Sequence, residues 1–108
     1  SRDHWRRVMV GHAAANLLPV AAANRVGVET TAISSITFYG SSFITDATGA
    51  VVTEAHDRPG TWLAAIDPEA TRLQRDAWGL FRDRRPDLYA SLITHGPTAR
   101  SLTIEQGR

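Results

Sequence analysis

The stretch ITFYGSSFITDATGAVVTEA, residues 36–55, decides the fold, because it predicts two strands joined by a tight turn. β-Branched and aromatic residues fill 36–45 and 51–55, and the sequence TDATGA at 45–50 has the polar residues and glycine typical of a hairpin turn. The Gly-Ser-Ser sequence at 40–42 interrupts the first strand, which indicates a bulge or a close approach of another backbone. We therefore predict an antiparallel hairpin with an irregular first strand.

Two elements are predicted before this hairpin. Apolar residues recur at helical spacing over 3–18, so we expect an amphipathic helix that Asp3 caps and Pro19 ends. Residues 20–26 (VAAANRV) are small and apolar without alternation, which predicts a strand buried on both faces. The polar segment 30–35 is expected to be a loop.

Three further elements are predicted after the hairpin. The turn HDRPG at 56–60 leads into a strand at 61–66. Asp67, Pro68 and Glu69 then have the types expected of an N-cap, a first helical residue and a first-turn acid, and Gly79 is the expected end of that helix. A short amphipathic piece follows Pro86, and 95–108 is expected to be a flexible or partner-docking tail. The predicted order is α-β-β-β-β-α-tail, an α/β arrangement that looks like one side of a sandwich.

The composition restricts the chemistry that the chain can perform. The 108 residues suffice for one domain at most, and the net charge of +1 attracts neither nucleic acid nor an anionic membrane. No apolar run approaches about 18 residues and no signal peptide pattern opens the chain, so we expect a cytoplasmic protein. The sequence contains no cysteine and no lysine, which excludes a thiolate nucleophile, a cysteine metal site and an amine base within it.

Few residues remain as candidates for a site. The four histidines are scattered, so no metal site is predicted, and no glycine-rich phosphate loop occurs. Asn24, Arg25 and Glu29 surround Gly27 where the buried strand ends, the place at which α/β proteins hold their sites. A turn with solvated charges explains these residues equally well. His12 and Asn16, beside the apolar stripe of the first helix, are expected to bond neighbouring backbone.

The sequence GLFRDRRPDLY, residues 79–89, concentrates charge near the end of the chain. Three arginines would suit an anionic partner, but two aspartates stand among them, and this favours pairing within the segment. No basic surface is predicted elsewhere, so a nucleic-acid site is a weak interpretation.

Three motifs in order give the chain a resemblance to a known family. DHWRRVMVGHAAANLLPVAAANRVGVE (3–29), ITFYGSSFI with TGAVVTEA (36–55) and WGLFRDRRPDLY (78–89) resemble the C-terminal part of the carbon–nitrogen hydrolases, the nitrilase superfamily. The similarity covers about 1–92, and the short polar loop at 30–35 departs from it. The resemblance implies the second half of a four-layer α-β-β-α sandwich over 1–94, a homo-oligomer, and no cofactor or metal.

The resemblance also implies an activity and roles for residues. Members of this family use a Glu, a Lys and a Cys, all upstream of the matched region, so no catalytic residue is expected in this segment and the segment alone is expected to be inactive. The implied substrate is a small carbamoyl amine, N-carbamoylputrescine or a related ureido amine, hydrolysed to the free amine, carbon dioxide and ammonia. Matches to the family's NRxGxE turn and FYGSS strand imply a substrate-wall role for Asn24, Arg25, Glu29, Tyr39, Ser41 and Ser42. An interface or structural latch is expected from Arg82, Asp83, Arg84, Arg85, Leu88 and Tyr89.

Two hypotheses stay open at this point. The chain is either the C-terminal part of an amidohydrolase or a non-catalytic module that self-associates through the family's assembly surface. An upstream cysteine would support the first hypothesis, and self-association without ammonia release would support the second.

Overall fold

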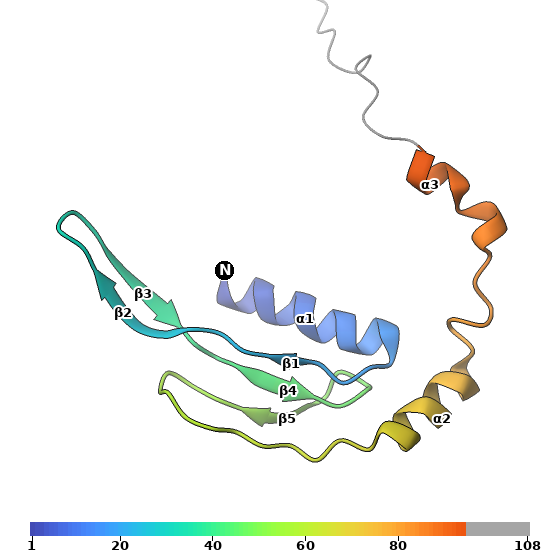
Figure 1. Ribbon diagram of the computed structural model, residues 1–108, viewed down its shortest axis with the longest axis horizontal. Coiled ribbons are helices and arrows are strands. Elements are labelled where there is room, and N and C mark those ends of the chain that lie inside the picture. The colour runs from blue at the N-terminus through green and yellow to red at the C-terminus, as the bar shows by residue number, and fades with distance from the viewer. Residues whose placement is uncertain (95–108) are drawn as a thin grey trace, which may run out of the picture.

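A computed structural model describes residues 1–94, and its centre is a small antiparallel sheet with one helix against it (Figure 1). The sheet has the order β1-β4-β5, with β1 at Ala21–Ala22, β4 at Phe43–Thr45 and β5 at Val51–Glu54. Helix α1, Arg2–Asn16, lies along this sheet. The β4–β5 hairpin confirms the hairpin predicted from 36–55.

The register of the sheet determines which side chains meet α1. Phe43 pairs with Ala22 on one side and Glu54 on the other, so all three project from the same face. Trp5 of α1 packs edge-on against Phe43, with 5.5 Å between ring centroids. Ile44 and its partners project from the opposite face, which α1 leaves open.

A second, two-stranded sheet extends sideways from the first (Figure 1). It pairs β2, Val26–Thr30, with β3, Ser35–Tyr39. The strand predicted over 20–26 is therefore wrong as one element, because the chain leaves β1 after Ala22 and starts a new strand at Val26. The loop predicted over 30–35 is shorter, since residues 30 and 35 are the last pair of this ladder.

The interruption predicted at 40–42 is confirmed. Residues 40–42 separate β3 from β4, and the Gly40 backbone lies so close to its neighbours that a Cβ would be 2.5 Å from the His56 carbonyl oxygen. The two breaks, at 23–25 and at 40–42, let the chain pass from one sheet to the other and back.

The C-terminal elements leave the sheet in an arc (Figure 1). They are α2 at Pro68–Trp78, the 3-10 helix η1 at Pro86–Leu88 and α3 at Ala90–Thr94. The strand predicted at 61–66 is wrong as a paired strand, because this segment is extended but pairs with no other strand in the described part of the chain. The predicted order consequently changes to five short strands, and the predicted tail at 95–108 lies outside the described residues.

The predicted helix ends are largely confirmed. The Asp67 carboxylate accepts hydrogen bonds from the Glu69 and Ala70 backbone, and Gly79 ends α2 with φ 67°. Asp3 is not the cap of α1: the helix begins one residue earlier, with Ser1 as N-cap, and Leu17 ends it in the left-handed conformation. None of the described helices is long and apolar enough to cross a membrane.

The buried core is small for the length of the chain. The buried apolar residues are Ala13, Leu17, Ala22, Phe43, Ala47 and Ala55, four of them alanines. The radius of gyration is 20.7 Å, whereas a compact domain of this length would have about 13 Å. The chain is thus an open, thin layer, and most of its large apolar side chains lie on the surface.

Candidate functional site

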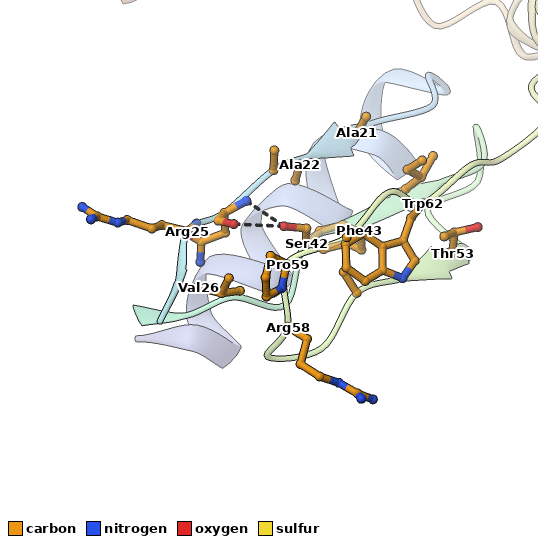
Figure 2. Close-up of a pocket in the computed structure, with 15 residues that line it drawn as sticks. Ala21, Ala22, Arg25, Val26, Ser42, Phe43, Thr53, Arg58, Pro59 and Trp62 are labelled. Carbon is orange, nitrogen blue, oxygen red and sulfur yellow. Dashed lines mark hydrogen bonds between the residues drawn. The ribbon is translucent and has the colours of Figure 1, made fainter. Parts of the chain in front are cut away.

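The junction between the two sheets brings Asn24 and Ser42 together. The Ser42 hydroxyl accepts a hydrogen bond from the Asn24 backbone N–H at 2.8 Å and lies 3.2 Å from the Asn24 carbonyl, to which it donates (Figure 2). The Asn24 side-chain amide donates to the Gly40 carbonyl at 2.8 Å. Two motifs that are separate in the sequence therefore hold one crossing point of the chain.

Arg25 and Glu29 form a bridge along the exposed face of β2. Their side chains make two hydrogen bonds of 3.0 and 3.1 Å, and the Arg25 guanidinium lies 4.5 Å from the centre of the Phe38 ring. Gly27 lies between them in the strand, opposite Phe38, and a Cβ there would touch nothing. The missing side chain leaves the space across which Arg25 reaches Glu29.

Ser41 lies beside this junction in a conformation that residues other than glycine rarely adopt. Its φ is 62°, it is buried, and its hydroxyl donates to the Tyr39 carbonyl at 3.2 Å. Its backbone N–H donates to the His56 carbonyl at 2.9 Å. The backbone strain is therefore held by hydrogen bonds on both sides of the residue.

A hollow of about 540 Å³ opens on the sheet face away from α1. Ala21, Val26 and Ile44 contribute to its apolar wall, and the segment that carries Pro59 and Trp62 passes over it (Figure 2). Arg25 and Arg58 are on its rim with their guanidinium groups directed away from the hollow. It is an apolar recess with charge only at its edge.

A second, polar hollow lies at the start of α1. Tyr39 and Ser41 line it together with Arg6, Glu54 and His56. The six predicted wall residues are thus divided: Asn24, Arg25 and Ser42 line the apolar hollow, Tyr39 and Ser41 line the polar one, and Glu29 lines neither.

The ion pair between Arg6 and Glu54 joins α1 to β5 beside the polar hollow. Two guanidinium–carboxylate hydrogen bonds form it, the longer at 3.0 Å, and both side chains are about two-thirds covered. Hydrogen bonding from Arg6 lowers the pKa of the Glu54 carboxyl; partial burial opposes this shift, and the charges of Arg6, His56 and Arg2 add to it. Arg6 also lies 5.4 Å from the centre of the Phe43 ring, so the pair is continuous with the packed face of the sheet.

Two of the three arginines of 79–89 are paired with aspartates within that segment. Arg82 bonds Asp83 at 2.7 Å and Arg85 bonds Asp87 at 2.6 Å, and each of these contacts lowers the pKa of the aspartate. The Arg85 backbone N–H donates to the Tyr89 hydroxyl at 3.0 Å. Two more guanidinium groups, from Arg75 and Arg84, lie 4.5 and 5.1 Å from the Phe81 ring centre.

The arrangement can orient and enclose a ligand but lacks a nucleophile of the thiolate type. The chain has no cysteine, and Ser41 and Ser42 donate their hydroxyl protons to backbone carbonyls, with no histidine as partner. Among residues 1–94, no three His, Asp or Glu side chains are grouped closely enough to hold a metal ion.

Sequence reasoning missed Trp62, Arg58 and the Arg6–Glu54 pair. Arg6 and Glu54 are 48 residues apart, and no periodicity connects a helix position with a strand position at that separation. For Trp62 a signal existed: an aromatic residue two positions after the turn residue Gly60 is placed by that turn, in this case against Gly60 itself.

The sequence is similar to a known protein family and to several characterised proteins. A family model described as carbon-nitrogen hydrolase matches residues 1–76. The chain is 52% identical over 99 residues to the N-carbamoylputrescine amidase of Arabidopsis thaliana, a match covering 87% of this chain and 33% of that protein. It is 54% identical over 95 residues to the citrullinase of Francisella tularensis, covering 86% of this chain and 33% of the relative.

A solved structure has the same fold. It is the carbon-nitrogen hydrolase from Helicobacter pylori G27, with a TM-score of 0.78 and 41% identity over 87% of this chain and 33% of that chain. This likeness confirms the predicted α/β class as a partial nitrilase-like fold. The chain spans about a third of the length of the relatives that it matches.

Proposed function

Since the chain belongs to the carbon–nitrogen hydrolase family, we propose that it is part of an amidohydrolase acting on a carbamoylated amine. The proposed reaction takes N-carbamoylputrescine, or a related ureido amine, and water to the free amine, carbon dioxide and ammonia. The observation that supports this proposal is that sequence identity differs between two groups of relatives. Identity is 50–54% to proteins named N-carbamoylputrescine amidase and citrullinase, and 33–35% to those named probable nitrilase and deaminated glutathione amidase.

The two groups of more similar relatives suggest a common substrate chemistry. N-Carbamoylputrescine and citrulline both carry a carbamoyl group on a primary aliphatic amine, and they differ at the other end, where citrulline has a carboxylate beside its ammonium. We favour the carbamoylated diamine, because both guanidinium groups on the rim of the apolar hollow are directed away from it and would not meet a carboxylate inside. A polyamine-forming role in the cytoplasm follows as part of the same proposal.

The chemistry would require groups that this chain does not contain. In the proposed mechanism a cysteine thiolate attacks the carbamoyl carbon, a lysine stabilises the oxyanion, and a glutamate transfers a proton to the departing ammonia. Water then cleaves the carbamoyl thioester, and the carbamic acid loses carbon dioxide to give the amine. Without cysteine or lysine, the 108-residue chain is proposed to have no turnover by itself and to supply substrate-wall and structural residues.

In this proposal the wall residues and the charged segment have different tasks. Asn24 and Ser42 would fix the shape of the wall, since their hydrogen bonds hold the crossing between the sheets. Residues 82–85, with Leu88 and Tyr89, would act as a latch at the contact between subunits. Local pairing of Arg82 and Arg85 with aspartates supports this, because covering those four charges would not leave any of them unpaired.

The test uses a chimera in which this sequence replaces the aligned third of the Arabidopsis thaliana relative. We expect ammonia release from N-carbamoylputrescine, slower release from citrulline, and none from the 108-residue chain alone. Release by the isolated chain would contradict the proposed division of tasks. A folded chimera that hydrolyses neither compound would contradict the proposed reaction.

The second candidate is a non-catalytic, self-associating module. The observation in its favour is the row of exposed apolar side chains on the arc that α2, η1 and α3 form, namely Leu73, Trp78, Leu88, Leu92 and Ile93. This candidate predicts a stable homo-oligomer of the chain in sedimentation experiments at micromolar concentration. A chain that is monomeric there would exclude it.

A further inference from the structure

Glu29 belongs to the NRxGxE turn but lines neither hollow, so its task must be sought in what it contacts. Its carboxylate accepts two hydrogen bonds from the Arg25 guanidinium, from Nη1 to Oε2 at 3.0 Å and from Nη2 to Oε1 at 3.1 Å. Two parallel bonds of this kind fix the direction of a guanidinium, which a single contact does not. Glu29 therefore acts on the hollow through a neighbouring side chain.

The backbone of Arg25 is fixed at the rim of the apolar hollow. Its N–H donates to the Asn24 side-chain oxygen at 2.9 Å, and its carbonyl accepts from the Gly40 N–H at 2.9 Å. Arg25 is one of the residues that line the hollow, in the segment between β1 and β2. With the backbone held on both sides, only the long side chain can change direction, either along β2 or toward the hollow.

Two contacts keep the Arg25 side chain along β2. Arg25 reaches Glu29 across Gly27, where no side chain separates them. Phe38 is the cross-strand partner of Gly27, and the centre of its ring lies 4.5 Å from the Arg25 guanidinium. Figure 2 shows the result, a side chain directed away from the hollow at whose rim its backbone lies.

The direction of Arg25 determines which charge a ligand in the hollow would meet. A guanidinium turned over the hollow would attract a carboxylate and repel an ammonium, whereas one held along β2 does neither. N-Carbamoylputrescine ends in an ammonium alone, and citrulline ends in an ammonium with a carboxylate beside it. Holding the guanidinium away therefore removes an advantage that the second compound would otherwise have.

We infer that Glu29 is a specificity-determining residue: by holding Arg25 along β2, it keeps a positive charge away from the apolar hollow and favours a carbamoylated amine without a carboxylate. This role rests on the proposed function, since it requires the hollow to receive the carbamoylated compound. It gives a task to a residue of the motif that lies outside both hollows.

The experiment compares Glu29→Gln with its parent in the chimera with the Arabidopsis thaliana relative. The substitution keeps the size of the side chain and removes its charge, so Arg25 loses its ionic partner and can pair with the carboxylate of a ligand. We expect the ratio of kcat/KM for citrulline to kcat/KM for N-carbamoylputrescine to rise about fivefold, mainly through KM. An unchanged ratio would overturn the inference.

Glu69→Gln is the matched control. Glu69 is also paired with an arginine, Arg72, but it lies on α2 and lines neither hollow. The control should keep the ratio of the parent chimera. A rise as large as that of Glu29→Gln would show that the loss of any acidic charge suffices, and this would also overturn the inference.

The double variant Arg25→Gln with Glu29→Gln tests whether the guanidinium causes the change. Its ratio should equal that of Arg25→Gln alone, because no charge is then left for Glu29 to hold. A gain that persisted in the double variant would assign the change to another cation, such as Arg58 on the same rim, and would overturn the inference. The side chains of Arg25 and Glu29 are 59% and 50% exposed, so these substitutions should leave the fold intact.

Equilibrium binding separates a failure of this role from a failure of the proposed function. Calorimetry gives dissociation constants of citrulline and N-carbamoylputrescine for an inactive chimera. If Glu29→Gln shifted the ratio of those constants, the role of Glu29 would be supported and the proposed reaction contradicted. An active chimera with the same selectivity in parent and variant would do the reverse. A chimera that bound neither compound would contradict both.

Discussion

At the scale of single residues, the crossing between the two sheets depends on a position where no side chain fits. Gly40 has φ 59°, and an added Cβ would lie 2.5 Å from both the His56 carbonyl oxygen and a Val26 methyl group. Its own N–H donates to the Arg25 carbonyl at 2.9 Å, so the residue cannot move without breaking the crossing. Asn24 and Ser42 then complete the junction with side-chain hydrogen bonds.

We therefore expect Gly40→Ala to destabilise the chain by about 1–3 kcal/mol, the usual range for overpacking a site that cannot relax. Thermal unfolding followed by circular dichroism measures the change. Gly11→Ala is the matched control, because Gly11 is on an exposed helix position with nothing within 4 Å of the added Cβ. This control should gain about 1 kcal/mol from helix propensity. A Gly40 variant as stable as the parent would show that the crossing is not rigid.

The Arg6–Glu54 pair makes stability depend on pH in a defined direction. Arg6 lowers the pKa of Glu54 in the folded chain. The Glu54 carboxyl therefore binds a proton less tightly in the folded state than in the unfolded state. The contribution is therefore complete above the ordinary glutamate pKa of about 4.3, and it is lost as the pH falls through the lower pKa of the folded state.

Glu54→Gln should cost about 1 kcal/mol at pH 7, and the difference from the parent should disappear in acid below that range. Urea titrations at several pH values measure it. Arg6→Met, which removes the cationic partner of Glu54, should remove the same pH dependence. The double variant completes a cycle that gives the coupling free energy between the two residues. If the two single variants kept the acid dependence of the parent, the pair would not be its source.

At the scale of elements, α2 is a helix stabilised mainly by its own contacts. Its N-cap Asp67 accepts two backbone hydrogen bonds, and Arg72 pairs with Glu69 and Asp76 on one side of the helix. Contacts with other elements are few, apart from a shallow apolar recess beside Leu18 and Pro19. A helix of 11 residues with so little tertiary support is marginal in water, so its cap has a large effect.

Asp67→Ala should consequently reduce the circular dichroism signal of helix at 222 nm. It should also destabilise α2 by about 1 kcal/mol. Asp67→Ser, which retains a capping oxygen, should restore most of the signal. Asp57→Ala serves as the control, since Asp57 is exposed in a turn and caps no helix. An unchanged spectrum for Asp67→Ala would mean that packing, and not the cap, holds α2.

The elements show which features local sequence determines. The caps of α2, the end of the helix at Gly79 and the hairpin at 45–50 were predictable because their signals are within a few residues of each other. The division of 20–26 was not, since it depends on Gly40 and Ser42, which come much later in the chain. For 61–66 the pattern of a strand is present, but among residues 1–94 this segment pairs with no strand, so the local pattern did not predict its pairing.

The candidate site was predictable to a similar degree. The motif residues Asn24 and Ser42 do meet, yet Tyr39 and Ser41 lie in a different hollow and Glu29 lines neither. Motif spacing indicates that residues belong to one family pattern, whereas their separation into two hollows depends on the crossing between the sheets. The sequence near each motif does not predict this crossing, because it is formed by contacts between residues far apart in the chain.

At the scale of the whole molecule, few of the large apolar side chains among residues 1–94 are buried. Six apolar residues of the described part are buried, while Val28, Ile33, Leu63, Trp78, Leu92 and other large apolar side chains are exposed. One face of the central sheet is covered by α1 and the other is open. The chain matches about a third of the length of its relatives, which agrees with a layer that packs against further chain.

We expect this open surface to bind the dye ANS strongly in the isolated chain, because ANS fluoresces on exposed apolar surface. In the chimera with the Arabidopsis thaliana relative the same residues should be covered, and emission per molecule should fall toward that of the parent enzyme. Leu63→Ser, at a position where the side chain is 85% exposed, should reduce emission in the isolated chain and change it little in the chimera. If the isolated chain bound no ANS and scattered X-rays as a particle with a radius of gyration near the compact value of about 13 Å, the open arrangement would be wrong for the chain in solution. A radius near 20.7 Å at high dilution, together with strong ANS emission, would agree with the open arrangement.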